Sequence, residues 1–295
     1  HDVRHFTTRC RKLPSTYKDL IMKTIIVPTD FSHVAENALN YAVDMACSID
    51  ASLLIVHVYQ VPVTFTEVPV IALSLEEIKQ ISEEKMVALK KRVVERAGGK
   101  LKVYTECRLG DVVDEIGSVA RSIQPLTIVM GTKGQSSMER LFLGSNTLTA
   151  IRHLSVPILV VPPNARFQPI RRIGFACDFD KVVDSTPVKP IHQFCNAFRA
   201  ELHVLNVDHK NKHFTPGTPE ESLLLHTMIE DLKPSYHFID DTDIELGIQE
   251  FAKSHAIDLV ITIPKKHKLL DSLFQHSHTK DLIFHADLPI LCIHE

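Results

Sequence analysis

Three glycines and a serine form the part of the sequence whose residue types and spacing are best suited to chemistry. Gly131, Gly134 and Gly144 are followed by Ser145 in the pattern G-x2-G-x9-G-S. Glycines let backbone N–H groups approach an anion closely, because no Cβ intervenes. A helix that begins after Gly144 would add its unpaired N–H groups and the positive end of its dipole. The pattern therefore favours a phosphate-binding loop.

The polar residues beside these glycines fit the same chemistry. The hydroxyls of Ser145 and Thr147 add hydrogen-bond donors, and Lys133 adds a positive charge for the outer phosphates. The loop lacks the GKS or GKT ending of a Walker A loop, and no GxGxxG follows the first apolar run. Because glycine loops alone are common, the prediction depends on where this loop lies in the fold.

An alternation of strand and helix patterns places the glycine loop after the fourth strand of a sheet. The expected strands are 23–28, 52–58, 101–107, 126–130 and 156–161, and the expected helices are 33–48, 75–97, 110–123 and 146–154. The strands are short continuous apolar runs, typical of parallel strands covered on both faces. Ligands of such sheets bind beyond the carboxyl ends of the strands, where Pro28 and Asp30 also lie. Asp30 or Ser32 is expected to cap the first helix.

The pattern restarts after a linker, residues 164–169. Its second copy reuses the first, second, fourth and last strands and the third helix at residues 172–178, 201–207, 258–263, 288–293 and 243–255. Residues 128–161 align without a gap on 260–293. This internal repeat predicts two tandem domains, 22–163 and 170–295, each a five-stranded parallel α/β sandwich. Pairing of the two last strands, 156–161 and 288–293, would satisfy two sheet edges.

The second copy departs from the first at the glycine loop. The three glycine positions are occupied by Ile263, Lys266 and His276. Pro264 also removes an N–H from the loop. Side chains at these positions prevent a close backbone approach to phosphate. We therefore expect nucleotide to bind in the first copy only.

Composition excludes several classes of protein. The chain has 295 residues, of which 44% are hydrophobic and 23% charged, and its net charge of −3 argues against a binder of duplex nucleic acid. No apolar run approaches the length of a membrane span. The six cysteines form no CxxC pair, which is typical of a reduced, cytoplasmic protein. Residues 1–21 are basic without the apolar core of a secretory signal, and we interpret them as an N-terminal extension, non-native or disordered, before a natural start at Met22.

The chain resembles the universal stress protein family over residues 22–295, as two copies. The resemblance rests on Ile25–Ser32 (IIVPTDFS), His57-Val58, the glycine loop and Val156–Pro162 (VPILVVP). It implies an adenine nucleotide alpha hydrolase-like, Rossmann-like fold and an ATP site. The adenine and ribose pocket would be lined by Pro28, Thr29, Asp30 and Val58. The ribose and phosphates would be held by Met130, Gly131, Lys133, Gly134, Gly144, Ser145, Asn146 and Thr147. Mg²⁺ or Mn²⁺ fits beside the phosphates, held mostly by ligand oxygens and water.

The function that this resemblance implies is an ATP-binding regulator of stress response or signalling. No catalytic residue is assigned, because GxSxG and HExxH motifs are absent and no dedicated base faces a γ-phosphate. Two alternatives remain open: a slow ATPase or nucleotidyl transferase, and a scaffold or small-ligand module with incidental nucleotide. The expected partner is an adenine nucleotide, and the sequence leaves a further homodimer open.

Two lesser clusters are interpreted as structural. His276 and His278 could suggest a metal site, but the sequence does not show that they converge, so we interpret them as surface histidines and assign no metal ligand. Asp240, Asp241 and Asp243 are interpreted as the turn and cap before the third helix of the second copy.

Overall fold

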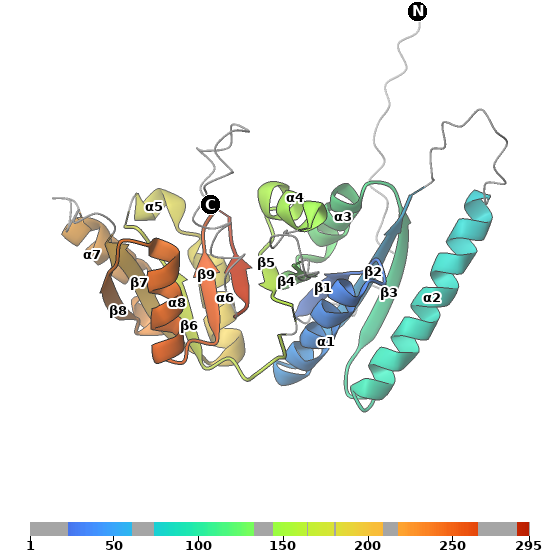
Figure 1. Ribbon diagram of the computed structural model, residues 1–295, viewed down its shortest axis with the longest axis horizontal. Coiled ribbons are helices and arrows are strands. Elements are labelled where there is room, and N and C mark those ends of the chain that lie inside the picture. The colour runs from blue at the N-terminus through green and yellow to red at the C-terminus, as the bar shows by residue number, and fades with distance from the viewer. Residues whose placement is uncertain are drawn as a thin grey trace, which may run out of the picture.

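A computed structural model describes residues 23–60, 74–132, 144–163, 165–179, 181–208, 218–264 and 288–294. In this part of the chain, helices cover a single long sheet with the strand order β3-β2-β1-β4-β5-β10-β9-β6-β7-β8 (Figure 1). The predicted α/β class with mainly parallel strands is confirmed. The two expected five-stranded sheets are joined edge to edge into one sheet of ten strands.

The N-terminal half contains five strands and four helices among the described residues. They are β1 Thr24–Pro28, α1 His33–Ser48, β2 Ser52–Tyr59, α2 Leu75–Arg96, β3 Val103–Leu109, α3 Val112–Ile123, β4 Thr127–Gly131, α4 Ser145–His153 and β5 Ile158–Val161. The third strand starts and ends two residues later than predicted, because its pairing with β2 runs from Val103 to Leu109. The last strand begins only after Pro157, which has no N–H to donate to a neighbouring strand.

The C-terminal half repeats this order of elements, except that its described residues include no counterpart of α4. They are β6 Arg172–Ala176, α5 Val182–Ser185, α6 Val188–Phe198, β7 Glu201–Asp208, α7 Thr218–Ile229, a 3₁₀ turn at Glu230–Leu232, β8 Ser235–Asp240, α8 Ile244–Ser254, β9 Leu259–Thr262 and β10 Ile290–Cys292. Strand register repeats as well. Ile128 lies opposite Ile158, and Val260 lies opposite Ile290, as the gapless alignment of the two copies requires. One difference is that the counterpart of α1 is divided into α5 and α6, with Pro187 between them.

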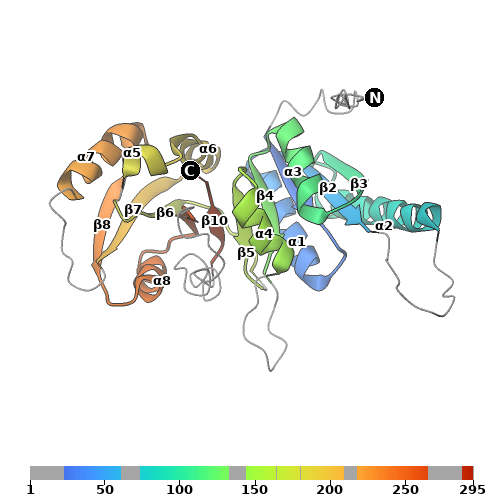
Figure 2. The same ribbon diagram turned by 90° about the horizontal axis from the view of Figure 1, so that it is seen from above.

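The two halves meet where β5 pairs with β10, the one antiparallel pairing between described strands (Figure 2). Leu159 lies opposite Leu291, flanked by the pairs Val160 with Ile290 and Ile158 with Cys292. The joint is therefore symmetric about its central leucine pair, and both leucines are fully buried. Strands of the two halves run in opposite directions. The pairing of the last strands expected from the sequence is present, and it removes two sheet edges.

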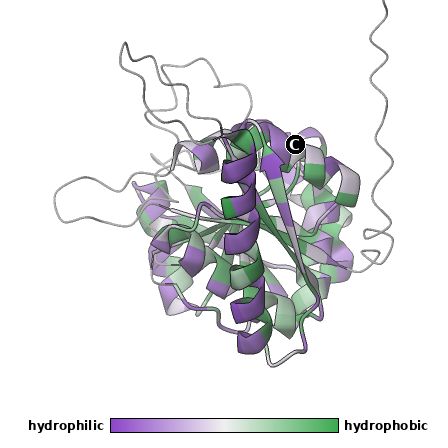
Figure 3. Cartoon of the chain, turned by 90° about the vertical axis from the view of Figure 1, so that its right-hand side faces the viewer, coloured by the Kyte–Doolittle hydropathy of each residue, from purple (hydrophilic) through white to green (hydrophobic). Residues whose placement is uncertain are grey.

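Each face of the sheet carries one apolar layer that continues across the joint. Residues of α1, α2, α6 and α7 pack on one face, and residues of α3, α4 and α8 pack on the other. The outward side of α2, which faces the viewer in Figure 3, is mostly hydrophilic, as its many Glu and Lys residues predict. No helix in the described ranges combines the length and apolar character needed to cross a membrane.

The segment between the halves packs against the N-terminal half. The Phe167 ring meets the Tyr41 ring of α1 edge-on, with 5.4 Å between centroids. Asn37, also on α1, donates from Nδ2 to the Pro162 carbonyl at 3.0 Å. The linker predicted at 164–169 therefore contacts α1 through Phe167, and the chain just before the linker is held on α1 at Pro162.

Candidate functional site

A cavity of about 300 Å³ lies at the carboxyl edge of the N-terminal half. Its wall combines the end of β1, the start of α1, the end of β2, the start of α3, the end of β4 and the start of α4. Because adjacent parallel strands end at the same sheet edge, segments far apart in the sequence meet there. The volume lies at the lower end of the range for small-molecule pockets.

The turn after β1 forms one wall of the cavity. The Thr29 side chain accepts a hydrogen bond from the Phe31 N–H at 3.1 Å, and Asp30 Oδ1 accepts one from the Ser32 N–H at 2.9 Å. Ser32 caps α1 by accepting from the Ala35 N–H at 3.3 Å. Of the two expected caps, Ser32 is therefore the N-cap, and Asp30 holds the turn before it. The first turn of α1 already has an acceptor from its own chain.

Another wall is the start of α4, for which the described part of the chain supplies no such acceptor. Gly144 is the N-cap residue, no side chain of the described residues caps the helix, and no acidic residue lies in its first turn. Ser145 and Asn146 are exposed. The first N–H groups of α4 and the positive end of its dipole are therefore available to an anion in the cavity.

The two glycines of the loop that the structure describes, Gly131 and Gly144, differ in how their surroundings would accept a side chain. A Cβ on Gly131 would lie 2.7 Å from Val34 Cγ1 and 2.8 Å from the Val34 carbonyl oxygen, so this glycine lets β4 pack against α1. Among the described residues, a Cβ on Gly144 would meet only Thr147 Oγ1, at 3.8 Å, and the backbone of Gly144 has φ −58°. Neither packing nor backbone geometry therefore requires glycine at position 144. Its position on the cavity wall supplies a reason, because a side chain there would take up ligand space.

The Thr147 hydroxyl, expected from the sequence to be a donor for the ligand, already has a partner within the chain. It is buried and donates to the Gly131 carbonyl at 3.2 Å. Its proton is thus used to hold the start of α4 against the end of β4, and it is not a free donor for a ligand. The Ser145 hydroxyl and the Asn146 carboxamide, both on exposed residues, remain side-chain donors at this helix start.

The structure brings together every predicted site residue that it describes. The cavity wall includes Pro28, Thr29, Asp30, Val58, Met130, Gly131, Gly144, Ser145, Asn146 and Thr147. The two other predicted residues, Lys133 and Gly134, lie outside the described residues. Sequence reasoning missed five lining residues, namely Ser32, Val34, Ala35, Val56 and Val112. They lie at the same strand ends and helix starts, so the rule that ligands gather at this edge could have found them.

The wall divides into an apolar and a polar part. Val56, Val58, Val112 and Met130 give it apolar surface, while Asp30 and the start of α4 give it acceptors and donors. Asp30 is the one ionisable side chain among the described lining residues. The site can hold a ligand with an apolar ring, hydroxyl groups and an anionic end, and its described part holds no pair of nucleophile and base.

The corresponding region of the C-terminal half is built differently. Ile263 lies where the N-terminal half has Gly131, and it packs against the core. A helix start as close to this position as Val34 is to Gly131 would clash with the isoleucine side chain. The break between α5 and α6 lies in the counterpart of α1. The remainder of the second loop, with Lys266 and His276, lies outside the described residues.

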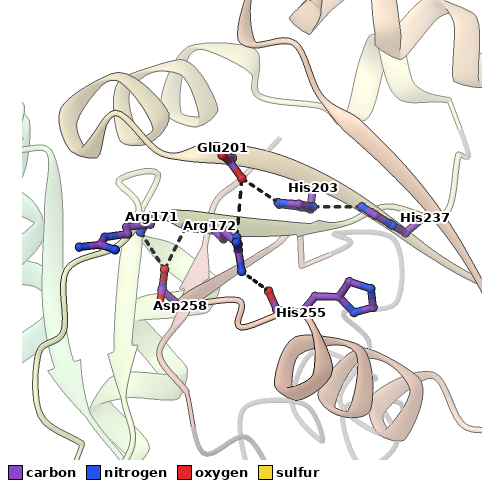
Figure 4. Close-up of polar contacts among 7 residues, drawn as sticks. All are labelled: Arg171, Arg172, Glu201, His203, His237, His255 and Asp258. Carbon is purple, nitrogen blue, oxygen red and sulfur yellow. Dashed lines mark hydrogen bonds and ion pairs between the residues drawn. The ribbon is translucent and has the colours of Figure 1, made fainter.

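A histidine pair in the C-terminal half is a second polar cluster, which sequence reasoning missed (Figure 4). His203 Nδ1 on β7 lies 3.0 Å from His237 Nε2 on β8, and His203 Nε2 lies 3.7 Å from the Glu201 carboxylate. Arg172 Nε lies 3.6 Å from the same carboxylate. Burial lowers the pKa of both histidines, since it disfavours the charged imidazolium.

Neither this pair nor the aspartates form a metal site in the described part of the chain. No group of three or more His, Cys, Asp or Glu side chains there is arranged to hold a metal ion. His276 and His278 lie outside the described residues. Asp243 caps α8 by accepting from the Leu246 N–H, and Asp241 accepts from the Asp243 N–H, so the turn-and-cap interpretation of these aspartates is confirmed.

Comparisons with known proteins agree with the sequence motifs and the fold. Residues 22–162 match the model of the universal stress protein family. A universal stress protein of Methanocaldococcus jannaschii is 35% identical over 144 residues, which cover 48% of this chain and 82% of that protein. A putative universal stress protein of Staphylococcus aureus is 33% identical over 151 residues, covering 50% of this chain and 90% of that protein. A crystal structure of a universal stress protein from Archaeoglobus fulgidus shares the fold over 92% of this chain and 98% of its own, with a TM-score of 0.68 and 18% identity. The chain therefore belongs to the universal stress protein family.

Proposed function

We propose that the N-terminal half binds ATP in its cavity and that the chain acts as a nucleotide-responsive regulator. The observation that carries this proposal is the uncapped start of α4, which faces a cavity with apolar surface elsewhere on its wall. An uncapped helix start is an anion site, and valine and methionine side chains suit the faces of a purine.

Each part of ATP has a matching part of the wall. The adenine ring fits against Val56, Val58 and Met130. The exposed carboxylate of Asp30 suits the ribose hydroxyls, because a carboxylate accepts hydrogen bonds from hydroxyl groups and repels phosphates. The phosphates fit at Gly144 and Ser145. Lys133 and Gly134 complete the proposed site, and Mg²⁺ or Mn²⁺ would accompany the phosphates, held mostly by their oxygens.

We propose further that each chain binds one nucleotide. The proposal treats residues 22–163 as a nucleotide-binding domain and residues 170–295 as a second domain of the same fold without this function. Ile263 supports it, because it takes the place of Gly131, which lines the cavity in the N-terminal half. The division of the counterpart of α1 is a second departure from the N-terminal half. A second domain of this kind can stabilise the first through β5 and β10 or contact another molecule.

The test is calorimetric titration of the full chain with ATP and Mg²⁺. We expect one site per chain. Asp30→Ala should weaken binding by about tenfold, the equivalent of one hydrogen bond to a charged group. Asp178→Ala is the matched control, because Asp178 follows β6 as Asp30 follows β1, and it should leave the affinity unchanged. A wild-type chain that binds no ATP, or an Asp178→Ala variant that loses binding alone, would contradict the proposal.

The same samples separate regulation from catalysis. ADP release followed over hours should be slow or absent in the wild-type chain, since the described cavity holds no nucleophile and base pair. Sustained ADP release that Asp30→Ala abolishes would instead identify an ATPase. A Gly144→Asp chain that loses ATP but keeps all partner binding would identify a scaffold in which nucleotide is incidental.

A further inference from the structure

The turn that lines the cavity after β1 holds an unusual backbone conformation. Phe31 has φ +63°, in the left-handed region that residues other than glycine seldom adopt. Such a residue persists only where the surroundings fix it. Thr29 and Asp30 line the cavity directly before it, so the shape of this wall depends on what holds the turn.

His57 supplies one of the contacts that hold the turn. Its Nδ1 lies 2.8 Å from the Thr29 carbonyl oxygen. A carbonyl oxygen only accepts, so Nδ1 must carry the proton in this bond. The His57 ring also packs on the Phe31 ring, with 4.6 Å between centroids. His57 is not among the residues that line the cavity, whereas its neighbours Val56 and Val58 are. Successive side chains of a strand point to opposite faces, so His57 supports the turn from the other side of the sheet.

The C-terminal half holds the same turn with a different side chain. Phe179 has φ +51°, and its N–H points to Cys177 Sγ at 3.5 Å, as the Phe31 N–H points to Thr29. Asn206 donates from Nδ2 to the Cys177 carbonyl at 2.9 Å. The N–H groups of Thr29 and Cys177 also make equivalent bonds, each 2.9 Å long, to the strand residue just before His57 or Asn206. The two halves thus keep the same bond to the same carbonyl.

The two side chains share one property, which is a nitrogen donor at the δ position. Imidazole and carboxamide differ in shape, basicity and ring character, yet each presents a δ nitrogen that can donate. The hydrogen bond, and not imidazole chemistry, is therefore what this position supplies in both halves.

We infer that His57 is a positioning residue for the proposed nucleotide site, acting through an Nδ1–H bond to the Thr29 carbonyl that fixes the wall formed by Thr29 and Asp30. This inference rests on the proposed function. It assigns His57 no contact with the ligand. It also fixes the form of the ring, which is either the neutral tautomer protonated at Nδ1 or the imidazolium.

Two substitutions that differ in one methylene test the inference. His57→Asn keeps a donor at the δ position, as Asn206 does, and should keep the ATP affinity of the full chain within about threefold of wild type. His57→Gln moves the donor one bond further out and should weaken ATP binding by about tenfold, the value of one lost hydrogen bond. Asn206→Gln makes the same change in the half without the cavity and should leave the affinity unchanged.

A spectroscopic measurement tests the bond itself. Nitrogen-15 NMR of the imidazole side chains should show a proton on His57 Nδ1 in the wild-type chain, with or without ATP. A neutral His57 protonated only at Nε2 would overturn the inference, and so would a His57→Gln variant that binds ATP as the wild type does. A wild-type chain that binds no ATP would overturn the proposed function together with this inference, whereas normal wild-type binding with an unaffected Gln variant would overturn the inference alone.

Discussion

Replacing Gly144 with aspartate should separate stability from ligand binding, because the two effects have opposite signs. The backbone of Gly144, with φ −58° and ψ 141°, suits any residue, and a Cβ there would lie 3.8 Å from its nearest neighbour among the described residues. An aspartate at this N-cap would accept from a first-turn N–H of α4. The hydrogen bond is worth a few tenths of a kcal/mol over glycine, and the charge at the helix start adds about 0.3–1 kcal/mol. The free protein should therefore melt about 1–3 °C higher.

The same carboxylate should exclude ATP from the cavity. It would occupy N–H groups that we propose for phosphate and place a negative charge beside it. One lost charge-assisted hydrogen bond costs about 1.5–3 kcal/mol, and repulsion at about 4 Å adds on the order of 1 kcal/mol or more. The sum of about 3–4 kcal/mol corresponds to a weakening of about 10²- to 10³-fold.

Calorimetric titration with ATP and a thermal melt of the free protein measure both effects. Gly144→Ala is the control for the added Cβ, since it carries no charge and should change the melting temperature little. An aspartate variant that melts higher but binds ATP within about threefold of wild type would refute the placement of phosphate at the start of α4. An aspartate variant that melts much lower would refute our account of Gly144 as a position free of packing constraints.

Three further predictions follow from particular contacts. Gly131→Ala should lower the free energy of unfolding in urea by about 1–3 kcal/mol, because its Cβ would lie 2.7 Å from Val34 Cγ1; an unchanged midpoint would contradict this. Burial lowers the pKa of His203 and His237 below the value of about 6.5 for an unfolded histidine. The stability that the two neutral histidines contribute is therefore complete above about pH 6.5, and it is lost as the pH falls through their folded-state pKa values. Thermal melts at several pH values should show that the melting temperature falls more steeply with decreasing pH for wild type than for His203→Leu. An equal dependence on pH in the two proteins would contradict a contribution of the histidine pair. Asp111→Ala should cost about 1 kcal/mol in chemical denaturation, since the carboxylate accepts from two first-turn N–H groups of α3 at 2.9 and 3.2 Å; no change in stability would mean that this cap is dispensable.

The sequence by itself determined the elements and most of the proposed site. Helices and strands could be located because periodicity of apolar residues is a local property, readable over a window of ten to twenty residues. The lining residues at the ends of β1 and β4 could be predicted because parallel strands all end at one edge. The gapless alignment of residues 128–161 with 260–293 also implied that β9 and β10 share the register of β4 and β5, which they do. What failed locally was the placement of β3, whose ends depend on its partner strand, and α5, α6, α7 and β8 were not located from the sequence.

Only the tertiary structure decided which side chains of different elements contact one another. The role of Gly131 depends on Val34, and the Thr147 proton goes to the Gly131 carbonyl, so neither role is a property of the loop sequence alone. His203 and His237 are 34 residues apart and meet because β7 and β8 pair in one register. Contacts of this kind depend on the packing of segments distant in the chain, where a shift of one residue would turn a strand's side chains to the other face. Local sequence patterns carry no information about which residues of two strands lie opposite each other. The pairing of β5 with β10 could therefore be expected from the sequence, but the register that places Leu159 opposite Leu291 could not.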